Sequence, residues 1–170
     1  MEETIFIQMA AYRDPQLVPT VLDCIANAKH PERLHFCIGW QHSVDEKIDE
    51  LHELPNVEII DVPYEQAKGA CWIRNQIQQR YKDETYTLQL DSHHRFAKDW
   101  DEQVIGMFKQ LRGKGHPKPL LTGYISSFDP ENDPAGRTLT PWKMDFDRFI
   151  PEGAVFFLPA SIDDYLQRTE

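Results

Sequence analysis

The chain has few cysteines and no pattern that would join them. Cys24, Cys37 and Cys71 are odd in number, widely spaced and form no Cys-x-x-Cys pair. Neither a disulfide framework nor a thiolate zinc site is therefore predicted. We expect reduced thiols that are mostly buried.

Positive charge is also scarce. The chain has 18 Lys and Arg against 28 Asp and Glu, which gives a formal net charge of −10 and a pI near 5.1. A protein that binds nucleic acid needs clustered Lys and Arg to neutralise phosphates, and no such cluster is present, so we expect no nucleic-acid partner. An anionic ligand would instead need a local cation.

Long apolar runs are missing as well. No stretch approaches the length that spans a bilayer, and the N-terminal Met-Glu-Glu-Thr is acidic and leads directly into a short apolar run. The sequence therefore predicts no membrane span and no secretory signal. From this we predict a cytoplasmic protein.

The 170 residues, 41% of them hydrophobic, suffice for one α/β domain with a sizeable core. Apolar runs of strand length alternate with segments of helical periodicity, which predicts a mainly parallel, Rossmann-like sheet with helices on both faces. We expect strands at 5–11, 33–40, 57–62, 86–90, 120–126 and 154–158, and helices from about 17 to 30, at 45–54, 66–82, 99–111 and 161–167.

Two of these strands carry more specific expectations. The alternation within 33–40 favours a sheet edge or a half-covered face, whereas 86–90 is predicted to be a buried strand. Residues 128–142 lack periodicity and are rich in Pro, Asp, Asn, Gly and Thr. They predict a long surface loop of the kind that often serves as a lid.

The most informative stretch is Asp91-Ser92-His93, directly after the strand at 86–90. In open α/β sheets, ligands bind outside the carboxyl ends of the strands. Because side chains alternate along an extended chain, Asp91 and His93 should face one side, with Ser92 turned away. We therefore predict that Asp91 and His93 hold a metal ion, and that His94 faces elsewhere.

Three motifs, in this order and spacing, resemble the N-acetylglucosaminyltransferase family typified by the Skp1 GlcNAc-transferase. They are Ala11-Tyr-Arg-Asp-Pro15, Ala67-Lys-Gly-Ala-Cys-Trp-Ile-Arg74, and Leu88-Gln-Leu-Asp-Ser-His93 followed by Phe96 and Trp100-Asp101. The resemblance covers Ile5 to about Gly123, and the Asp-Ser-His turn also resembles that of the polypeptide N-acetylgalactosaminyltransferases. It implies one GT-A-like domain, with a nucleotide-sugar-binding part at 1–126 and a loop-rich, partial acceptor part at 127–170.

The resemblance implies transfer of N-acetylglucosamine from UDP-GlcNAc to a hydroxyl acceptor on a protein, a glycan or a lipid-linked molecule, with retention. Asp91 and His93 would be the catalytic pair that holds Mn²⁺ or another divalent cation. The chemistry agrees, because a bound dication stabilises the charge of a diphosphate leaving group. A carboxylate with an imidazole also suits a first-row ion better than calcium.

The resemblance assigns the loop Tyr12-Arg13-Asp14 to the uridine. Tyr12 could stack on the base, and Asp14 could accept a hydrogen bond from ribose or uracil. For Asp14 the alternative is a plain helix cap, because Pro15 follows it.

Lys68, Gly69 and Arg74 resemble the family's second nucleotide element, with a glycine for close approach and an arginine for phosphate or uracil. For Arg74 the alternative is a salt bridge in solvent. Ser92 is included among the nucleotide-sugar-binding residues. Trp100 could form a wall of the sugar or acceptor site, and core packing at a helix start is its alternative.

After Phe128 the sequence lacks a counterpart of the family's Gly-Glu-Glu-bearing acceptor region. A short or truncated C-terminal part is therefore expected, and donor binding is better supported than turnover. Two other functions stay open: a non-catalytic or truncated nucleotide-sugar-binding module, and a metal-dependent phosphoester hydrolase. A two-metal hydrolase would need more ligands than this chain clusters in one place.

Overall fold

The computed structural model describes residues 3–164. The chain divides into two compact units, Met1–Met107 and Phe108–Glu170, and their boundary falls within α4. The first unit contains β1 (Ile5–Tyr12), α1 (Leu17–Asn27), β2 (Leu34–His42), α2 (Asp49–His52), β3 (Val57–Pro63), α3 (Ala70–Gln78), β4 (Tyr86–Asp91) and the start of α4 (Trp100–Gly113); the second contains the end of α4, β5 (Trp142–Phe149) and β6 (Val155–Ser161).

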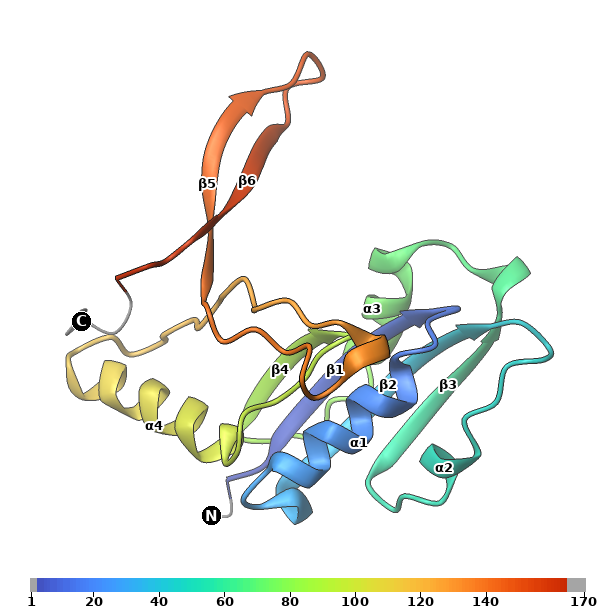
Figure 1. Ribbon diagram of the computed structural model, residues 1–170. Coiled ribbons are helices and arrows are strands. Elements are labelled where there is room, and N and C mark those ends of the chain that lie inside the picture. Colours follow the sequence, from blue (N-terminus) through green and yellow to red (C-terminus); the bar gives the residue numbers. More distant parts are fainter. Residues whose placement is uncertain (1–2, 165–170) are drawn as a thin grey trace. The chain divides into compact units, whose positions relative to one another are not determined.

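The first unit is built on a four-stranded parallel sheet in the order β3-β2-β1-β4 (Figure 1). In the sheet, Tyr12 of β1 is in register with Gln41 of β2, and Ala10 of β1 is in register with Asp91 of β4. The predicted mainly parallel α/β fold is confirmed. Because the strands are parallel, all four carboxyl ends lie on the same side of the sheet, which we call its carboxyl edge; an outer strand of the sheet is a different kind of edge.

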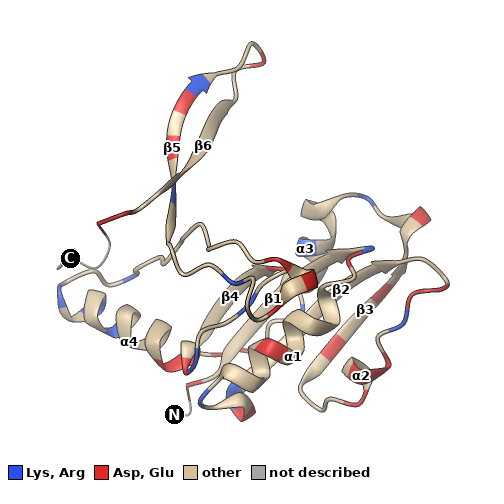
Figure 2. Cartoon of the chain, viewed as in Figure 1, with Lys and Arg blue, Asp and Glu red and all other residues tan. Residues whose placement is uncertain are grey.

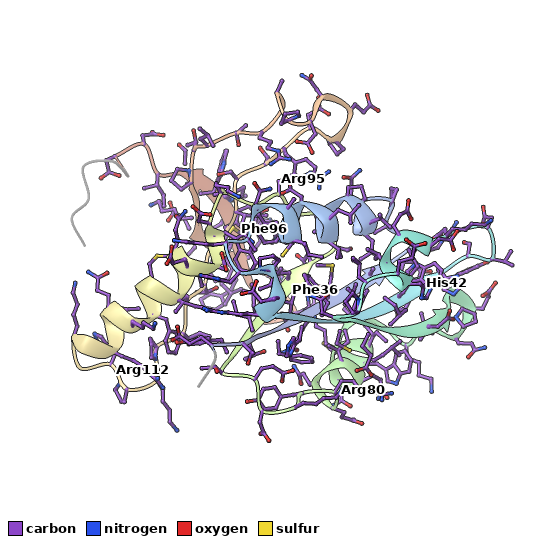
Figure 3. The ribbon with its side chains drawn as sticks, turned by 90° about the horizontal axis from the view of Figure 1, so that it is seen from below. Phe36, His42, Arg80, Arg95, Phe96 and Arg112 are labelled. Carbon is purple, nitrogen blue, oxygen red and sulfur yellow. The ribbon has the colours of Figure 1, made fainter. Side chains whose placement is uncertain are left out.

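Helices cover both faces of this sheet. On one face, α1 contributes Leu17, Val21 and Cys24 to a core that also contains inward-facing residues of β1 and β2, together with Trp100 and Ile105 of α4. On the other face, Ile73 and Ile77 of α3 pack in a second, smaller cluster. Figure 3 looks along the sheet and shows α1 on one side and α3 on the other.

The expectations for the strands at 33–40 and 86–90 were both wrong. β2 is an inner strand and almost fully buried, because it has a strand on each side and its residues pack into the cores on both faces. β4 is at the sheet edge, with Leu88 and Leu90 half-buried and Gln89 exposed between them. The alternation of apolar and polar residues in 86–90 is itself typical of a strand covered on one face.

The second unit differs most from the expectations. The strand predicted at 120–126 does not form, and Tyr124 makes only an isolated bridge to Trp142. The strand predicted at 154–158 is present as β6, which pairs antiparallel with β5, a strand that was not predicted. The first four residues of the helix predicted at 161–167 are not helical, since Ser161 ends β6 and residues 162–164 form no helix; residues 165–167 lie outside the described part of the chain.

Lys and Arg are scattered along the ribbon and do not gather on one element (Figure 2). None of the helices within residues 3–164 has the length and apolarity needed to cross a membrane. The thiols of Cys24 and Cys37 are buried, as expected, whereas Cys71 is exposed.

Candidate functional site

The strand order places a topological switch point between β1 and β4. From β1 the chain adds β2 and then β3 on one side, and β4 afterwards pairs with the other side of β1. In open parallel sheets, ligands bind in the crevice at such a point, outside the carboxyl ends of the strands. Asp14 follows β1 and Asp91 ends β4, so both lie at this edge.

The loops after β1 and β4 are joined by the Asp14 carboxylate. Asp14 Oδ2 accepts a hydrogen bond from Ser92 Oγ at 2.6 Å and lies 2.8 Å from His93 Nδ1. Asp14 Oδ1 accepts from the Gln16 amide at 2.8 Å in the turn before α1. The N-cap of α1 is Gln16, without a side-chain cap bond, so Asp14 is not the helix cap. Burial raises the pKa of Asp14, but these hydrogen bonds outweigh it and hold the pKa below its usual value.

Asp91 has a different partner, so the predicted alternation in this turn is wrong: Ser92 and His93 share the Asp14 carboxylate, and Asp91 contacts Arg74. Its Oδ1 lies 3.1 Å from Arg74 Nη2, in a pair whose side chains are 58% and 33% exposed for Asp91 and Arg74. Arg74 therefore forms the salt bridge named above as its alternative, but it does so with a predicted metal ligand. Through Arg74, the element that begins at Lys68 reaches the end of β4.

Gly69 begins α3 with a backbone that suits glycine. Its φ of +92° lies in the left-handed half of the Ramachandran plot, which residues with a Cβ rarely adopt. The ammonium of Lys68 lies 5.6 Å from the centre of the Trp72 ring. Because of this backbone conformation, Gly69 sets the direction in which α3 leaves the loop, and α3 in turn carries Arg74 to the carboxyl ends of the strands.

The loop after β4 is fastened along α1 by hydrogen bonds. Thr20 Oγ1 accepts from the His94 amide at 3.0 Å, and Asp23 Oδ2 accepts from the Phe96 amide at 2.7 Å. Gln16 Oε1 accepts from Arg95 Nη2 at 2.7 Å, and Figure 3 shows Arg95 and Phe96 beside α1. These bonds fix the backbone that carries Ser92 and His93.

Trp100 belongs to the core. Its side chain is 6% exposed, its ring centre lies 5.1 Å from that of Phe96, and its indole N–H donates to the Cys24 carbonyl at 2.9 Å. The Asp99 amide donates likewise to the Asn27 carbonyl at 2.7 Å. The start of α4 therefore satisfies carbonyls in the last turn of α1, and the role of Trp100 as a wall of the sugar site is corrected to core packing.

The Tyr12 side chain is largely exposed, whereas the Arg13 side chain has partners within the protein. Tyr12 is 56% exposed at the end of β1, so its ring is accessible to a base. Arg13 has a φ of +49°, and its guanidinium lies 3.5 Å from Glu46 Oε1 and 4.9 Å from the Tyr64 ring centre. A cavity of about 210 Å³ beside this loop is lined by Arg13, Asp14 and Trp40, among others.

A second polar group at this edge was not singled out by sequence. His42 Nε2 lies 3.1 Å from Asp61 Oδ1, and the His42 ring stacks on Trp40 with 3.6 Å between centres. Burial lowers the pKa of His42, but the Ser43 carbonyl and Asp61 outweigh it and raise the pKa overall. The available signal was position alone, because His42 ends β2 and Asp61 lies near the end of β3.

A larger cavity, of about 380 Å³, lies at the opposite edge of the sheet, near the amino ends of the strands. Its charged groups already pair with one another: Glu84 with His35 at 3.0 Å, and Glu58 with Arg80 and Lys82, each at 3.4 Å. Because these pairs leave no excess charge for a ligand, we locate the candidate site at the carboxyl edge.

The two residues predicted to bind a cation are exposed at the carboxyl edge, where Asp91 contacts Arg74 and His93 contacts Asp14. Asp91 and His93 are 58% and 60% exposed, and carboxylate with imidazole suits first-row dications. Across the described residues, no three His, Cys, Asp or Glu side chains come together in a way that could hold a metal. Two protein ligands would leave positions for phosphate oxygens and water, as in many nucleotide-bound dication sites.

The α/β architecture with a four-stranded parallel sheet is similar to that of a GT-A glycosyltransferase. The family model described as "Glycosyltransferase (GlcNAc)" matches residues 4–54 and 47–168. The chain therefore belongs to this glycosyltransferase family.

Among solved structures, the chain is similar to TarS 1–349 from S. aureus, with a TM-score of 0.51 and 12% identity over 63% of this chain and 32% of that chain. At this identity the likeness concerns the fold alone. The chain spans about a third of the length of that TarS chain. No curated protein matches the sequence.

Proposed function

We propose that this chain forms the donor-binding part of an N-acetylglucosaminyltransferase of the type that acts on Skp1. It would take N-acetylglucosamine from UDP-GlcNAc and transfer it, with retention, to a hydroxyl acceptor. Asp91 and His93 would hold a divalent cation, Mn²⁺ or a similar ion, against the diphosphate. When bound, such a cation stabilises the negative charge of the departing UDP.

The observation that carries this proposal is the position of Asp91 and His93 at the switch point of a GT-A sheet in a chain of this family. The exposed Arg74–Asp91 pair is no obstacle. Surface ion pairs contribute about 0–1 kcal/mol, so a dication and a diphosphate could separate this pair at little cost. Arg74 would then be free to bind a phosphate oxygen or the uracil.

The remaining predicted residues have roles that their surroundings support. The exposed ring of Tyr12 could stack on uracil. Arg13 lies against Tyr64 and Glu46 and would support the loop that holds the uridine. Gly69 would let a phosphate approach the backbone at the start of α3, with Lys68 beside it, and Ser92 would keep the turn after β4 in place through Asp14.

The test is a titration of UDP and UDP-GlcNAc with and without Mn²⁺. Asp91→Asn should abolish the increase in UDP affinity that Mn²⁺ provides, while urea denaturation shows an intact fold. Asp61→Asn is the matched control, because Asp61 is also an exposed carboxylate near a strand end and is paired with His42. An unchanged effect of Mn²⁺ in Asp91→Asn would contradict the proposal.

Analysis of the products formed from UDP-GlcNAc distinguishes a transferase from the two alternative functions, a non-catalytic module and a phosphoester hydrolase. A transferase releases N-acetylglucosamine to water or to an acceptor and leaves UDP, whereas a non-catalytic module binds the donor and leaves it intact. A phosphoester hydrolase would instead produce UMP or inorganic phosphate. The chain spans about a third of the matched TarS chain. If it binds UDP-GlcNAc but releases no sugar, the proposed donor site stands and the proposed transfer does not.

A further inference from the structure

The contact between Asp14 and His93 determines which ring nitrogen of His93 is free. His93 Nδ1 lies 2.8 Å from Asp14 Oδ2. An ionised carboxylate can only accept hydrogen bonds, so Nδ1 must carry the proton in this contact. In the neutral imidazole, Nε2 then keeps its unshared electron pair.

The Asp14 carboxylate is itself held firmly. Its side chain is 16% exposed, one oxygen accepts from the Gln16 amide, and the other accepts from Ser92 Oγ in addition to His93. Rotation of the carboxylate would break all three hydrogen bonds. Both oxygens are engaged by these three donors, so a donor from ribose or uracil would have to share Asp14 Oδ1 with the Gln16 amide.

We infer that Asp14 is a positioning residue, which holds His93 as the Nδ1–H tautomer so that Nε2 is the atom offered to a divalent cation. Histidines that bind metals usually donate their second N–H to a carboxylate or carbonyl, which fixes the orientation of the ring and increases its basicity. This inference rests on the proposed function, because it requires a cation at Asp91 and His93. The loop after β1 would then help to orient the proposed metal ligand His93.

The first experiment determines the tautomer without any metal. Long-range ¹⁵N NMR on the full chain at about pH 8.5, where imidazoles are neutral, should show the proton of His93 on Nδ1. In Asp14→Asn the side-chain amide still has an oxygen for the Gln16 amide, but its nitrogen cannot accept from His93, so the preference for Nδ1–H should be lost. A proton on Nε2 of His93 in the unmodified protein would overturn the inference, whether or not the variant folds.

The second experiment measures the affinity for Mn²⁺ in the absence of nucleotide, from the electron paramagnetic resonance signal of free Mn²⁺. Asp14→Asn should lower the affinity about 10- to 100-fold, the usual effect of losing a carboxylate behind a metal-binding histidine. The matched control is Asp23→Asn, which alters a carboxylate that accepts from the Phe96 amide in the same loop. Its affinity should stay within about threefold of the unmodified protein, because Asp23 is not among the residues proposed to hold or orient His93.

The outcomes separate this inference from the proposed function. If the unmodified protein binds Mn²⁺ and Asp91→Asn does not, the metal site stands, and an unchanged affinity in Asp14→Asn then refutes the role of Asp14 alone. An equal loss in Asp23→Asn also refutes it, because the effect would come from the loop as a whole. If the unmodified protein binds no Mn²⁺ with or without UDP, the proposed metal site fails and the inference fails with it.

Discussion

Replacing Trp100 with phenylalanine tests the assignment of this residue to the core. The indole N–H satisfies the Cys24 carbonyl in the last turn of α1, and the ring packs against Phe96. Leaving one buried hydrogen-bonding group without a partner costs about 1–3 kcal/mol. The smaller ring also leaves a void, so Trp100→Phe should lower the free energy of unfolding by about 2–4 kcal/mol in total.

The measurement is urea denaturation followed by circular dichroism, with titrations of UDP and UDP-GlcNAc on the folded variant. Trp72→Phe is the matched control, because Trp72 is only partly buried and its ring lies under Lys68. It should cost no more than about 1 kcal/mol, the value of an exposed cation–π contact. The folded Trp100→Phe variant should bind both ligands almost as tightly as the unmodified protein.

The opposite pattern would refute the reasoning. If Trp100 lined the sugar site, Trp100→Phe would weaken UDP-GlcNAc more than UDP, because only the former carries the sugar. The free energy of unfolding would then change by less than about 0.5 kcal/mol, as for most surface substitutions. The two assignments therefore differ in both measurements.

Two further predictions concern the core and the response to acid. A Cβ at Gly39 would collide with Ile73, whose Cδ1 would lie at 2.8 Å. Gly39→Ala should therefore lower the free energy of unfolding by about 1–3 kcal/mol through overpacking. In a protein that already carries Ile73→Ala, urea denaturation should show a smaller loss on Gly39→Ala. Burial raises the pKa of Asp101, but the amides of Lys29 and His30 outweigh it and lower the pKa overall. The ionised Asp101 carboxylate should therefore stabilise the fold fully above the ordinary pKa of 3.8, and less as the pH falls below it. The difference in unfolding free energy between Asp101→Asn and the unmodified protein should shrink toward about pH 3. A difference that stays constant with pH would contradict this.

The positions of the first four strands could be predicted because each is a compact apolar run bounded by turn residues. Their order in the sheet could not, since it depends on pairing between distant segments. β4 illustrates this: its sequence 86–90 shows the alternation of a half-covered strand, but whether it lies at the edge depends on its pairing with β1 alone. The strand predicted at 120–126 did not form because its pairing stops at a single bridge between Tyr124 and Trp142, and a strand needs continued pairing to be stable.

The location of the candidate site was predictable, but its internal contacts were not. A carboxylate, a hydroxyl and two imidazoles after a strand indicate a polar site at the sheet edge. The contact of Asp14 with His93 joins residues 79 positions apart, and it exists only because β4 pairs with β1. The contact of Arg74 with Asp91 requires that α3 cover the face toward which Asp91 points.

The charges at the site give a physical reason why a cation is needed there. Asp14 and Asp91 each carry one negative charge and Arg74 one positive charge, within a chain whose formal net charge is −10. A diphosphate brought to this edge alone would meet two carboxylates and a protein field of the same sign as its own charge. A dication between Asp91, His93 and the diphosphate would reverse the local balance, since its charge is then the largest at the site. The proposal therefore requires that UDP bind weakly without metal, and tight metal-free binding that Asp91→Asn leaves unchanged would show that Arg74 and the backbone at Gly69 suffice.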